Sequence, residues 1–365
     1  MTQPAERLTL EVRRDEWSTD RILHESLNES LADGEVLLRV DRMALTANNI
    51  SYAFSGDLLG YWGFFPAEAG WGRIPAMGYA DVQASAHPDI TVGERVWGFF
   101  PMSTHLTIKA GKVNPSGFVD TSEHRGDYAP IYAQFQRAAG NPIYEPARED
   151  QDSLLRGLFL TSWLCEDYIN DNDNFDGRAC LVTSASSKTS IALGHALSQR
   201  GELRAIGLTS TGNRGFCEQL GCYDKVVTYD DIEQLDNSEP VVMVDMAGSA
   251  DLTLRLHNHF RDNMKFSSKV GATHYEEAGA TEGMPGAEPE FFFAPGQAQK
   301  RTADWGPGEI EKRMGASFVA FRQFCDGWLK IDRHSGATAS RAAYQAVLAG
   351  RQPPANGCII SLWEQ

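Results

Sequence analysis

Residues 1–150 contain short apolar runs separated by turns. The segment 34–40 (GEVLLRV) follows a turn and alternates apolar with polar side chains, which is the pattern of a half-buried strand. Further short runs at 80–85, 95–100 and 105–110 stand between Gly and Pro residues. Strands this short and this closely spaced are typical of a β-barrel or sandwich, so we expect a small β-rich unit here.

Beyond residue 150 the pattern changes to strands that alternate with helices. Residues 154–169 are apolar at helical spacing, and a polar break follows them. The expected strands are 178–183, 203–208, 225–228, 240–245 and one that opens at 269–270, and the expected helices between them are 191–200 and 213–220. This alternation predicts an α/β unit with a doubly wound parallel sheet.

The last third of the chain is less regular. Residues 276–308 are rich in Gly, Pro and Ala around the sequence EFFFAP, and we interpret them as long loops that could act as a lid. After them we expect helices at 309–329 and 337–348 and a closing strand at 357–362.

Composition narrows the class of protein. Of the 365 residues, 33 are Lys or Arg and 49 are Asp or Glu, which gives a formal charge of −16. This excess of acid disfavours general binding to nucleic acid or to anionic membranes. Since there is neither an apolar run of about 20 residues nor a signal-peptide core, we expect a soluble, cytoplasmic protein. None of the six cysteines forms a C-x-x-C pair, so we expect reduced thiols and no metal site.

The most informative segment is the strand–turn–helix pattern at 179–197 (ACLVT-SASSKTS-IALGHAL). Ligands of open α/β sheets bind at the carboxyl ends of strands, where a helix N-terminus attracts phosphate. The usual dinucleotide loop has glycines at this point. The polar residues found here instead are Ser184, Ser186, Ser187, Lys188, Thr189 and Ser190. We interpret this turn as a phosphate-binding loop that uses hydroxyls, backbone N–H groups and one ammonium; the alternative is a polar turn that only caps the helix.

The end of the second predicted strand favours NADP over NAD. An NAD site places a carboxylate there to bind the adenosine ribose, but residues 207–214 (GLTSTGNR) contain none. Thr209, Ser210, Asn213 and Arg214 could instead hold a 2′-phosphate through hydroxyls, an amide and a guanidinium. The remaining candidate cofactor-binding residues, at later strand ends, are Tyr229, Asp245, Gly248 and Gly271.

A β-rich unit followed by this α/β unit resembles the medium-chain dehydrogenase/reductase superfamily. The segments that carry the resemblance are 34–56, 82–99, 161–169 and 207–232. The resemblance implies a GroES-like β-rich catalytic domain, made of residues 1–152 and 311–365. It also implies a Rossmann-type dinucleotide-binding domain at 153–310, and a homodimer formed through the sheet edges of the nucleotide domains.

The absence of zinc-binding motifs from the sequence indicates the branch of the superfamily. Zinc alcohol dehydrogenases have a Cys in the loop that here reads LTANN (45–49), and a Gly-His-Glu stretch where this chain has PAMGYA (75–80). The four-Cys lobe of those enzymes is absent as well. The chain therefore resembles the zinc-free quinone and enoyl reductases, as a subgroup with Ser and Lys in the phosphate loop.

This resemblance implies an NADPH-dependent reductase that transfers hydride to a conjugated double bond or a quinone. Tyr52 follows the loop that faces the nicotinamide in this branch and is the first candidate for the acid; Asn49, Thr46 and, on the interdomain helix, Tyr168 are further candidates. Each could equally be a packing residue. An aromatic loop at 61–71 could shape a pocket for an apolar substrate with a conjugated carbonyl. The alternatives are a ketone or alcohol oxidoreductase and a non-catalytic NADPH-binding sensor.

Overall fold

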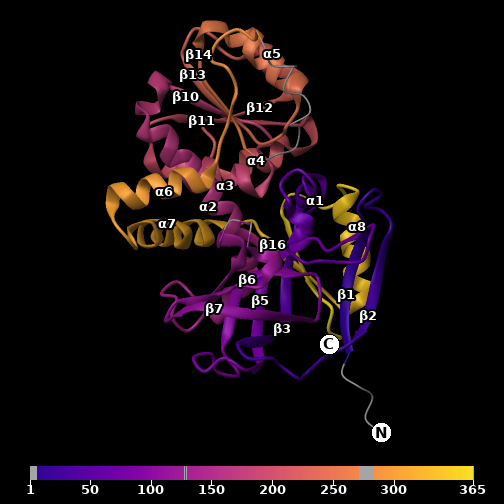
Figure 1. Ribbon diagram of the computed structural model, residues 1–365. Coiled ribbons are helices and arrows are strands. Elements are labelled where there is room, and N and C mark those ends of the chain that lie inside the picture. The colour runs from indigo at the N-terminus through magenta and orange to yellow at the C-terminus, as the bar shows by residue number, and fades with distance from the viewer. Residues whose placement is uncertain (1–5, 127, 129, 271–282, 365) are drawn as a thin grey trace. The chain divides into compact units, whose positions relative to one another are not determined.

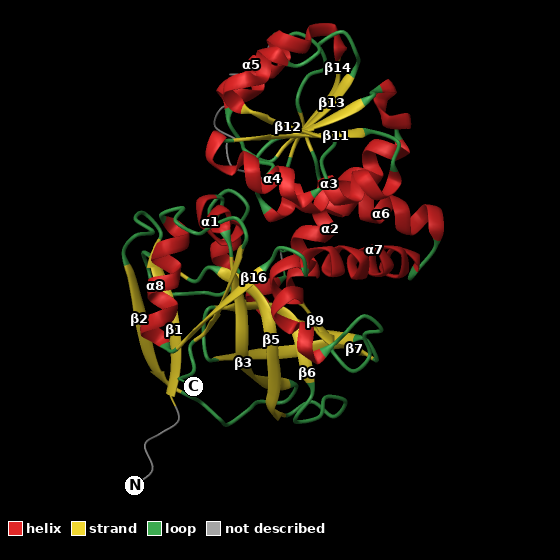
Figure 2. Ribbon diagram, turned by 180° about the vertical axis from the view of Figure 1, so that it is seen from behind, coloured by secondary structure: helices red, strands yellow, loops and turns green. Residues whose placement is uncertain are grey.

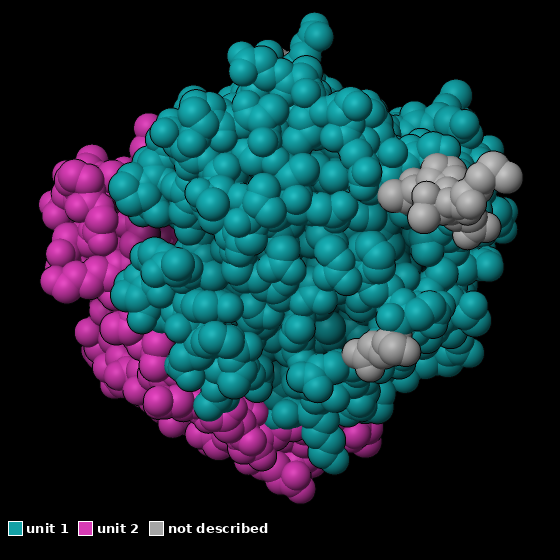
Figure 3. Space-filling model, turned by 90° about the horizontal axis from the view of Figure 1, so that it is seen from below, with its two compact units in different colours: residues 1–154, 329–365 teal, residues 155–328 magenta. Residues whose placement is uncertain are grey.

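The computed structural model describes residues 6–126, 128, 130–270 and 283–364. The chain forms two compact units, which Figure 3 shows in different colours. Unit 1 comprises Met1–Leu154 and Leu329–Gln365, and unit 2 comprises Leu155–Trp328. Each unit is described below by itself.

Unit 1 is built mainly of strands (Figure 1). Its strands are β1 (Glu6–Arg13), β2 (Asp20–Ser26), β3 (Glu35–Leu45), β4 (Trp71–Gly72), β5 (Pro75–Ser85), β6 (Arg95–Pro101), β7 (His105–Asn114), β8 (Gly117–Asp120), β9 (Gln134–Arg137), β16 (Lys330–Ser335) and β17 (Asn356–Ser361). Its α-helices are α1 (Ala47–Phe54) and α8 (Ala337–Leu348), and its 3-10 helices are η1 (Tyr61–Gly63), η2 (Glu123–Arg125), η3 (Pro130–Ala133) and η4 (Pro146–Arg148).

The larger sheet of unit 1 closes into a barrel. Its order is β16-β17-β3-β5-β6-β9-β8-β7, and β3 also pairs with β7. On β3, Val36 therefore lies opposite both Ser85 of β5 and Ile108 of β7. Closure leaves the backbone groups of the inner strands paired on both sides and buries an apolar interior, in which Val36, Leu38 and Val40 are almost completely inaccessible to solvent. The predicted β-rich unit is confirmed as a barrel.

Unit 2 contains one parallel sheet with helices on both faces (Figure 2). Its strands are β10 (Ala179–Val182), β11 (Arg204–Thr209), β12 (Lys225–Thr228), β13 (Val241–Asp245), β14 (Met264–Lys269) and β15 (Glu290–Phe291). Its α-helices are α2 (Glu149–Asp171, which begins in unit 1), α3 (Lys188–Arg200), α4 (Arg214–Leu220), α5 (Ala250–Phe260), α6 (Ala294–Trp305) and α7 (Glu309–Cys325). Its 3-10 helices are η5 (Asp173–Asp176), η6 (Thr211–Asn213), η7 (Tyr229–Gln234) and η8 (Arg261–Asn263).

The strand order is β12-β11-β10-β13-β14-β15. From β10 the chain adds strands first on one side and then, from β13, on the other, and such sheets bind ligands at this switch point. Neighbouring residues of a strand point to opposite faces, and this places α2 and α5 on opposite sides of the sheet. Phe266 of β14 packs on Tyr168 of α2, whereas the next residue, Ser267, bonds His257 of α5. The predicted doubly wound α/β unit is confirmed.

Three details differ from the sequence-based expectations. The fifth parallel strand, β14, ends at Lys269 rather than beginning there. The predicted loop region 276–308 contains β15 and α6, and its residues 276–282 lie outside the described residues. The expected domain boundary after residue 310 falls inside α7, whereas unit 2 extends to Trp328.

Unit 2 includes the whole of α7 because this helix packs against α2. Phe318 and Phe321 of α7 are completely buried against Phe159 of α2, with ring centroids 5.5 and 5.1 Å away. Composition alone did not show that this helix buries its aromatic face within unit 2.

Candidate cofactor and catalytic sites

The turn after β10 has an unusual backbone. Ser184 adopts φ +50°, the left-handed conformation that glycine adopts easily and that costs other residues about 1–2 kcal/mol. Its N–H donates to the hydroxyl of Tyr229 at 3.1 Å, and its carbonyl accepts from the N–H of Ser187 at 2.7 Å. A serine is thus held in a conformation typical of the glycines of a dinucleotide loop.

The same turn caps helix α3. Ser187 is the N-cap, and its hydroxyl oxygen accepts from the N–H of Ser190 at 3.2 Å. The Ser190 hydroxyl is itself used, since it donates to the carbonyl of Thr183 at 2.8 Å. Lys188 and Thr189 open the helix, where backbone N–H groups lack partners inside the helix. Ser187 and Ser190 therefore cap the helix, as the alternative interpretation of this turn has it. The N-terminus of α3, which attracts anions, lies at the same turn.

Residues after β11 reach back to this turn. The side-chain amide of Asn213 donates to the hydroxyl of Ser186 at 3.0 Å, so two of the predicted cofactor residues are in contact. Thr209 is buried at the strand end and Ser210 is exposed after it. Arg214 is half-exposed and pairs with Glu218 one turn later at 2.8 Å.

A carboxylate that sequence reasoning missed lies close to this group. Thr211 donates its hydroxyl hydrogen to Asp230 at 3.2 Å. Asp230 follows the third strand and lies 19 positions after Thr211 in the sequence. An inspection of residues 207–214 alone therefore could not reveal this carboxylate. Its position bears directly on the preference between NADP and NAD.

Tyr223 is a second residue that the sequence did not reveal. Its hydroxyl donates to the carbonyl of Ala185 at 2.8 Å, and its ring fills the space left by two glycines. A Cβ at Gly194 of α3 would lie 2.6 Å from this ring, and one at Gly207 of β11 would lie 3.0 Å from it. The packing that dinucleotide loops obtain through a glycine at the helix–strand contact is obtained here with two glycines and a tyrosine.

The turn after β13 is organised by Asp245. One oxygen of its buried carboxylate accepts from the Thr183 hydroxyl at 2.6 Å and from the N–H groups of Ala247 and Gly248 at 3.0 and 3.2 Å. Gly248 adopts φ +66°. These contacts make Asp245 a residue that shapes the loop. Gly271, the last predicted cofactor residue, lies outside the described residues.

In unit 1, Thr46 and Asn49 form a cap at the start of α1. Asn49 is buried; its amide oxygen accepts from the Thr46 N–H at 2.7 Å and its amide nitrogen donates to the carbonyl of Pro75 at 2.8 Å. This geometry is a capping box, and it anchors α1 to β5. Both the oxygen and the nitrogen of the Asn49 side-chain amide therefore form hydrogen bonds within unit 1.

Tyr52 is half-buried on α1 within an aromatic cluster. Its ring lies 4.8 Å from that of Tyr61 and 6.0 Å from that of Phe99. Burial raises the pKa of Tyr52, so that its hydroxyl keeps its proton at physiological pH. Among the described residues, no hydrogen bond to this hydroxyl occurs. Tyr52 is thus a neutral donor without a protein acceptor.

The aromatic loop predicted at 61–71 contributes to the same cluster. Tyr61, Phe64 and Phe65 are buried and pack with Tyr52 and Tyr132. The hydroxyls of Tyr61 and Tyr132 lie 3.3 Å apart. The start of the loop packs within unit 1 and contacts Tyr52.

Tyr168 belongs to unit 2, unlike the other three catalytic candidates. Its ring packs at 5.8–5.9 Å against Phe175, Phe266 and Phe292, and burial raises its pKa. These contacts describe a packing residue between α2 and the sheet.

A family model described as "Protein of unknown function (DUF2855)" matches residues 43–353. The chain belongs to the DUF2855 family. No curated protein sequence matches this member of the family.

Solved structures that resemble this DUF2855 chain cover it almost entirely. CurA from Vibrio vulnificus in complex with NADPH has 14% identity and a TM-score of 0.58, and the match covers 99% of this chain and 100% of that one. The quinone oxidoreductase from Coxiella burnetii has 11% identity and a TM-score of 0.57 (98% and 99%). The yhdH oxidoreductase from Salmonella enterica in complex with NADP has 11% identity and a TM-score of 0.54 (97% and 99%). The DUF2855 chain shares the two-domain fold of these oxidoreductases, as the resemblance predicted.

No helix in the described part of this DUF2855 chain is both long and apolar enough to cross a membrane. No group of three or more His, Cys, Asp or Glu side chains there is arranged to hold a metal ion.

Proposed function

We propose that this chain is a zinc-independent, NADP(H)-dependent oxidoreductase that reduces a conjugated double bond or a quinone. The observation that carries the proposal is the loop after β10, at the reversal point of the parallel sheet. There a strained Ser184, the Asn213–Ser186 contact and the start of α3 present hydroxyls and N–H groups together. The donor set suits a phosphate group.

The residues that would hold the cofactor follow from this arrangement. Ser186 and the first N–H groups of α3 would bind the pyrophosphate, with Lys188 as the cation of the loop. Ser210 and Arg214 would bind the 2′-phosphate. The bound cofactor would supply the hydride. Solved structures of similar fold are complexes with NADPH and with NADP, which supports this proposal.

Tyr52 would act as the hydrogen-bond donor to the substrate's carbonyl oxygen. Burial raises its pKa, so the phenol stays protonated at neutral pH and can donate, and among the described residues no acceptor uses its hydroxyl hydrogen. Thr46 and Asn49 would position it by anchoring α1. The aromatic cluster around Tyr52 favours an apolar substrate with a conjugated carbonyl. We assign no step to Tyr168.

The first experiment is NADPH oxidation with a panel of enones, quinones and ketones. We expect turnover with enones or quinones, and a Tyr52→Phe variant with kcat reduced about 100-fold and an unchanged Kd for NADPH. Tyr144→Phe is the matched control, because the Tyr144 hydroxyl donates to Glu149 on another part of unit 1. Turnover confined to ketones, or tight NADPH binding without turnover on any compound, would favour the two alternatives and refute the proposal.

The second experiment tests the cofactor residues by calorimetric titration. Lys188→Ala and Arg214→Ala should each weaken NADPH binding about tenfold, the loss expected for one charged contact. Arg214→Ala should also lower the preference for NADPH over NADH, whereas Arg204→Ala, an exposed arginine paired with Glu239 at the opposite end of β11, should change neither. An unchanged NADPH/NADH ratio in Arg214→Ala would remove that residue from the proposed 2′-phosphate site.

We also propose a homodimer through the edge of the unit 2 sheet and a cytoplasmic location. Within the described residues, β15 pairs only with β14, and Phe291 and Phe293 beside its free edge are 48% and 61% exposed. A second copy would cover them. Light scattering should report a dimer that Phe291→Lys converts to a monomer. The six cysteines are free and buried, which suits a reducing compartment.

A further inference from the structure

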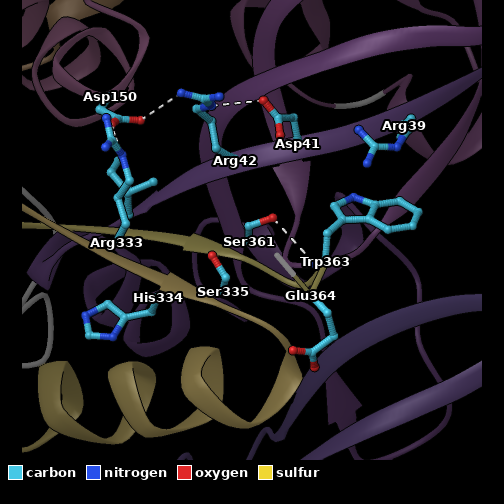
Figure 4. A pocket seen from close by; sticks show the side chains of 11 residues that line it. Arg39, Asp41, Arg42, Asp150, Arg333, His334, Ser335, Ser361, Trp363 and Glu364 are labelled. Atoms are coloured by element: carbon cyan, nitrogen blue, oxygen red, sulfur yellow. Dashed lines mark hydrogen bonds and ion pairs between the residues drawn. The ribbon is translucent and has the colours of Figure 1, made fainter.

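Unit 1 contains a cavity on the face formed by β16, β17 and β3 (Figure 4). Its volume is about 470 Å³, and its wall combines cationic, hydroxyl and carboxylate side chains. None of the residues assigned above to the cofactor or to the reaction lines it. The cavity therefore needs an explanation of its own.

Arg39 and Trp363 form one wall of this cavity. The guanidinium carbon of Arg39 lies 4.2 Å from the centre of the Trp363 ring, and Figure 4 shows the two side chains next to one another. The indole is held in place, because its N–H donates to the carbonyl of Val40 at 2.6 Å and His105 packs edge-on against it at 5.2 Å. The fixed indole thus gives the guanidinium a fixed aromatic surface to lie over.

The guanidinium of Arg39 keeps its donors available. Among the described residues it makes no ion pair and no hydrogen bond, and stacking on a ring face uses none of its N–H groups. The chain has 49 acidic and 33 basic side chains, so a carboxylate partner would be easy to supply. Arg13 shows the common arrangement: it also lies over a tryptophan, Trp71, but it pairs with Asp15 at 3.0 Å.

The carboxylates of the same cavity are already neutralised or directed elsewhere. Asp41 accepts from Arg42 at 2.9 Å and from Arg95 at 2.6 Å. Asp150 is buried and pairs with Arg42 at 3.3 Å and with Arg333 at 2.5 Å. The exposed carboxylate of Glu364 points away from Arg39 in Figure 4. The unbalanced charge at the Arg39 end is therefore positive.

Two hydroxyls complete the set of donors. Ser361 of β17 and Ser335 of β16 line the same cavity. The Ser361 hydroxyl oxygen accepts from the backbone N–H of Trp363 at 3.4 Å, which leaves its own hydrogen free to donate. We propose that this cavity binds a small organic anion whose carboxylate or phosphate group is held by the guanidinium of Arg39, with Ser361 and Ser335 as further donors. Two coplanar oxygens match the fork of N–H groups that a stacked guanidinium presents.

The test is calorimetric titration of the full-length protein at low ionic strength, with inorganic phosphate and with succinate as separate probes and sodium chloride as the ionic-strength control. We expect at least one probe to bind, Arg39→Gln to weaken it at least tenfold, and Arg39→Lys to weaken it less. Arg13→Gln is the matched control and should bind like the wild type. The NADPH affinity of Arg39→Gln should be unchanged, which separates this site from the proposed cofactor site.

The relative affinities of the two probes identify the preferred group. If Arg39→Gln does not fold, Trp363→Phe serves instead, because it retains the charge and loses most of the stacking plane; it should bind several-fold more weakly. Failure of both probes to bind the wild type below about 10 mM, a level at which one charged contact should be detectable, would overturn the proposal. So would equal binding by wild type and Arg39→Gln.

Discussion

The buried carboxylate of Asp245 offers the sharpest test of how the loops around the unit 2 sheet are held. In Asp245→Ala, the Thr183 hydroxyl hydrogen and the Gly248 N–H lose their acceptor, whereas Ala247 N–H retains a second acceptor in the Thr183 oxygen at 3.0 Å. A hydrogen bond to a charged group contributes about 1.5–3 kcal/mol. Two lost bonds therefore predict destabilisation of about 3–6 kcal/mol, which lowers the melting temperature of a domain of this size by roughly 6–24 °C.

The measurement is differential scanning calorimetry of the full chain. Asp245→Asn keeps an acceptor oxygen in the same place and should lose less than half as much stability as the alanine variant. Asp262→Ala, which removes an exposed carboxylate from the same unit, should melt like the wild type. A shift below about 3 °C for Asp245→Ala would refute the reasoning, because it would mean that the two lost hydrogen bonds contribute little in solution.

Three further predictions concern stability. Ser184→Gly should raise the melting temperature slightly, by the equivalent of about 0.5–1 kcal/mol, because glycine adopts φ +50° without the penalty of a side chain; Ser186→Gly, where φ is not positive, should lower it. Gly78→Ala should destabilise unit 1 by more than about 3 kcal/mol, since its Cβ would lie 2.0 Å from the carbonyl oxygen of Arg42 on β3, and a near-normal melt would contradict that contact. Burial, with the charges of Arg39 and Arg7, lowers the pKa of His105 to about 4 from 6.5. Because the unfolded chain takes up this proton first, stability is full above pH 6.5 and falls by about 3 kcal/mol towards pH 4. His105→Gln should flatten that part of the stability profile, and a profile identical to the wild type's would show that His105 titrates normally.

The local pattern of the sequence determined the architecture of both units. Alternation over a few residues predicted the strands of the barrel, and the strand–helix alternation after residue 150 predicted the parallel sheet, because both periods follow from backbone geometry within one element. The polar turn at 184–190 was also visible, since a helix start has a local signature in Ser187 and Ser190.

Only the tertiary structure decided which of these residues meet and which are already occupied. Pairing of β3 with both β5 and β7 closes the barrel, and no local sequence pattern predicts that closure. Asn49 and Asp245 looked available in the sequence, yet their polar atoms are engaged by Pro75 and by Thr183. Trp363 fixes Arg39 from the other end of the chain. The reason is physical: side-chain periodicity is a property of neighbouring residues, whereas contacts between distant residues depend on sheet register and loop closure, which are set only when the whole unit packs.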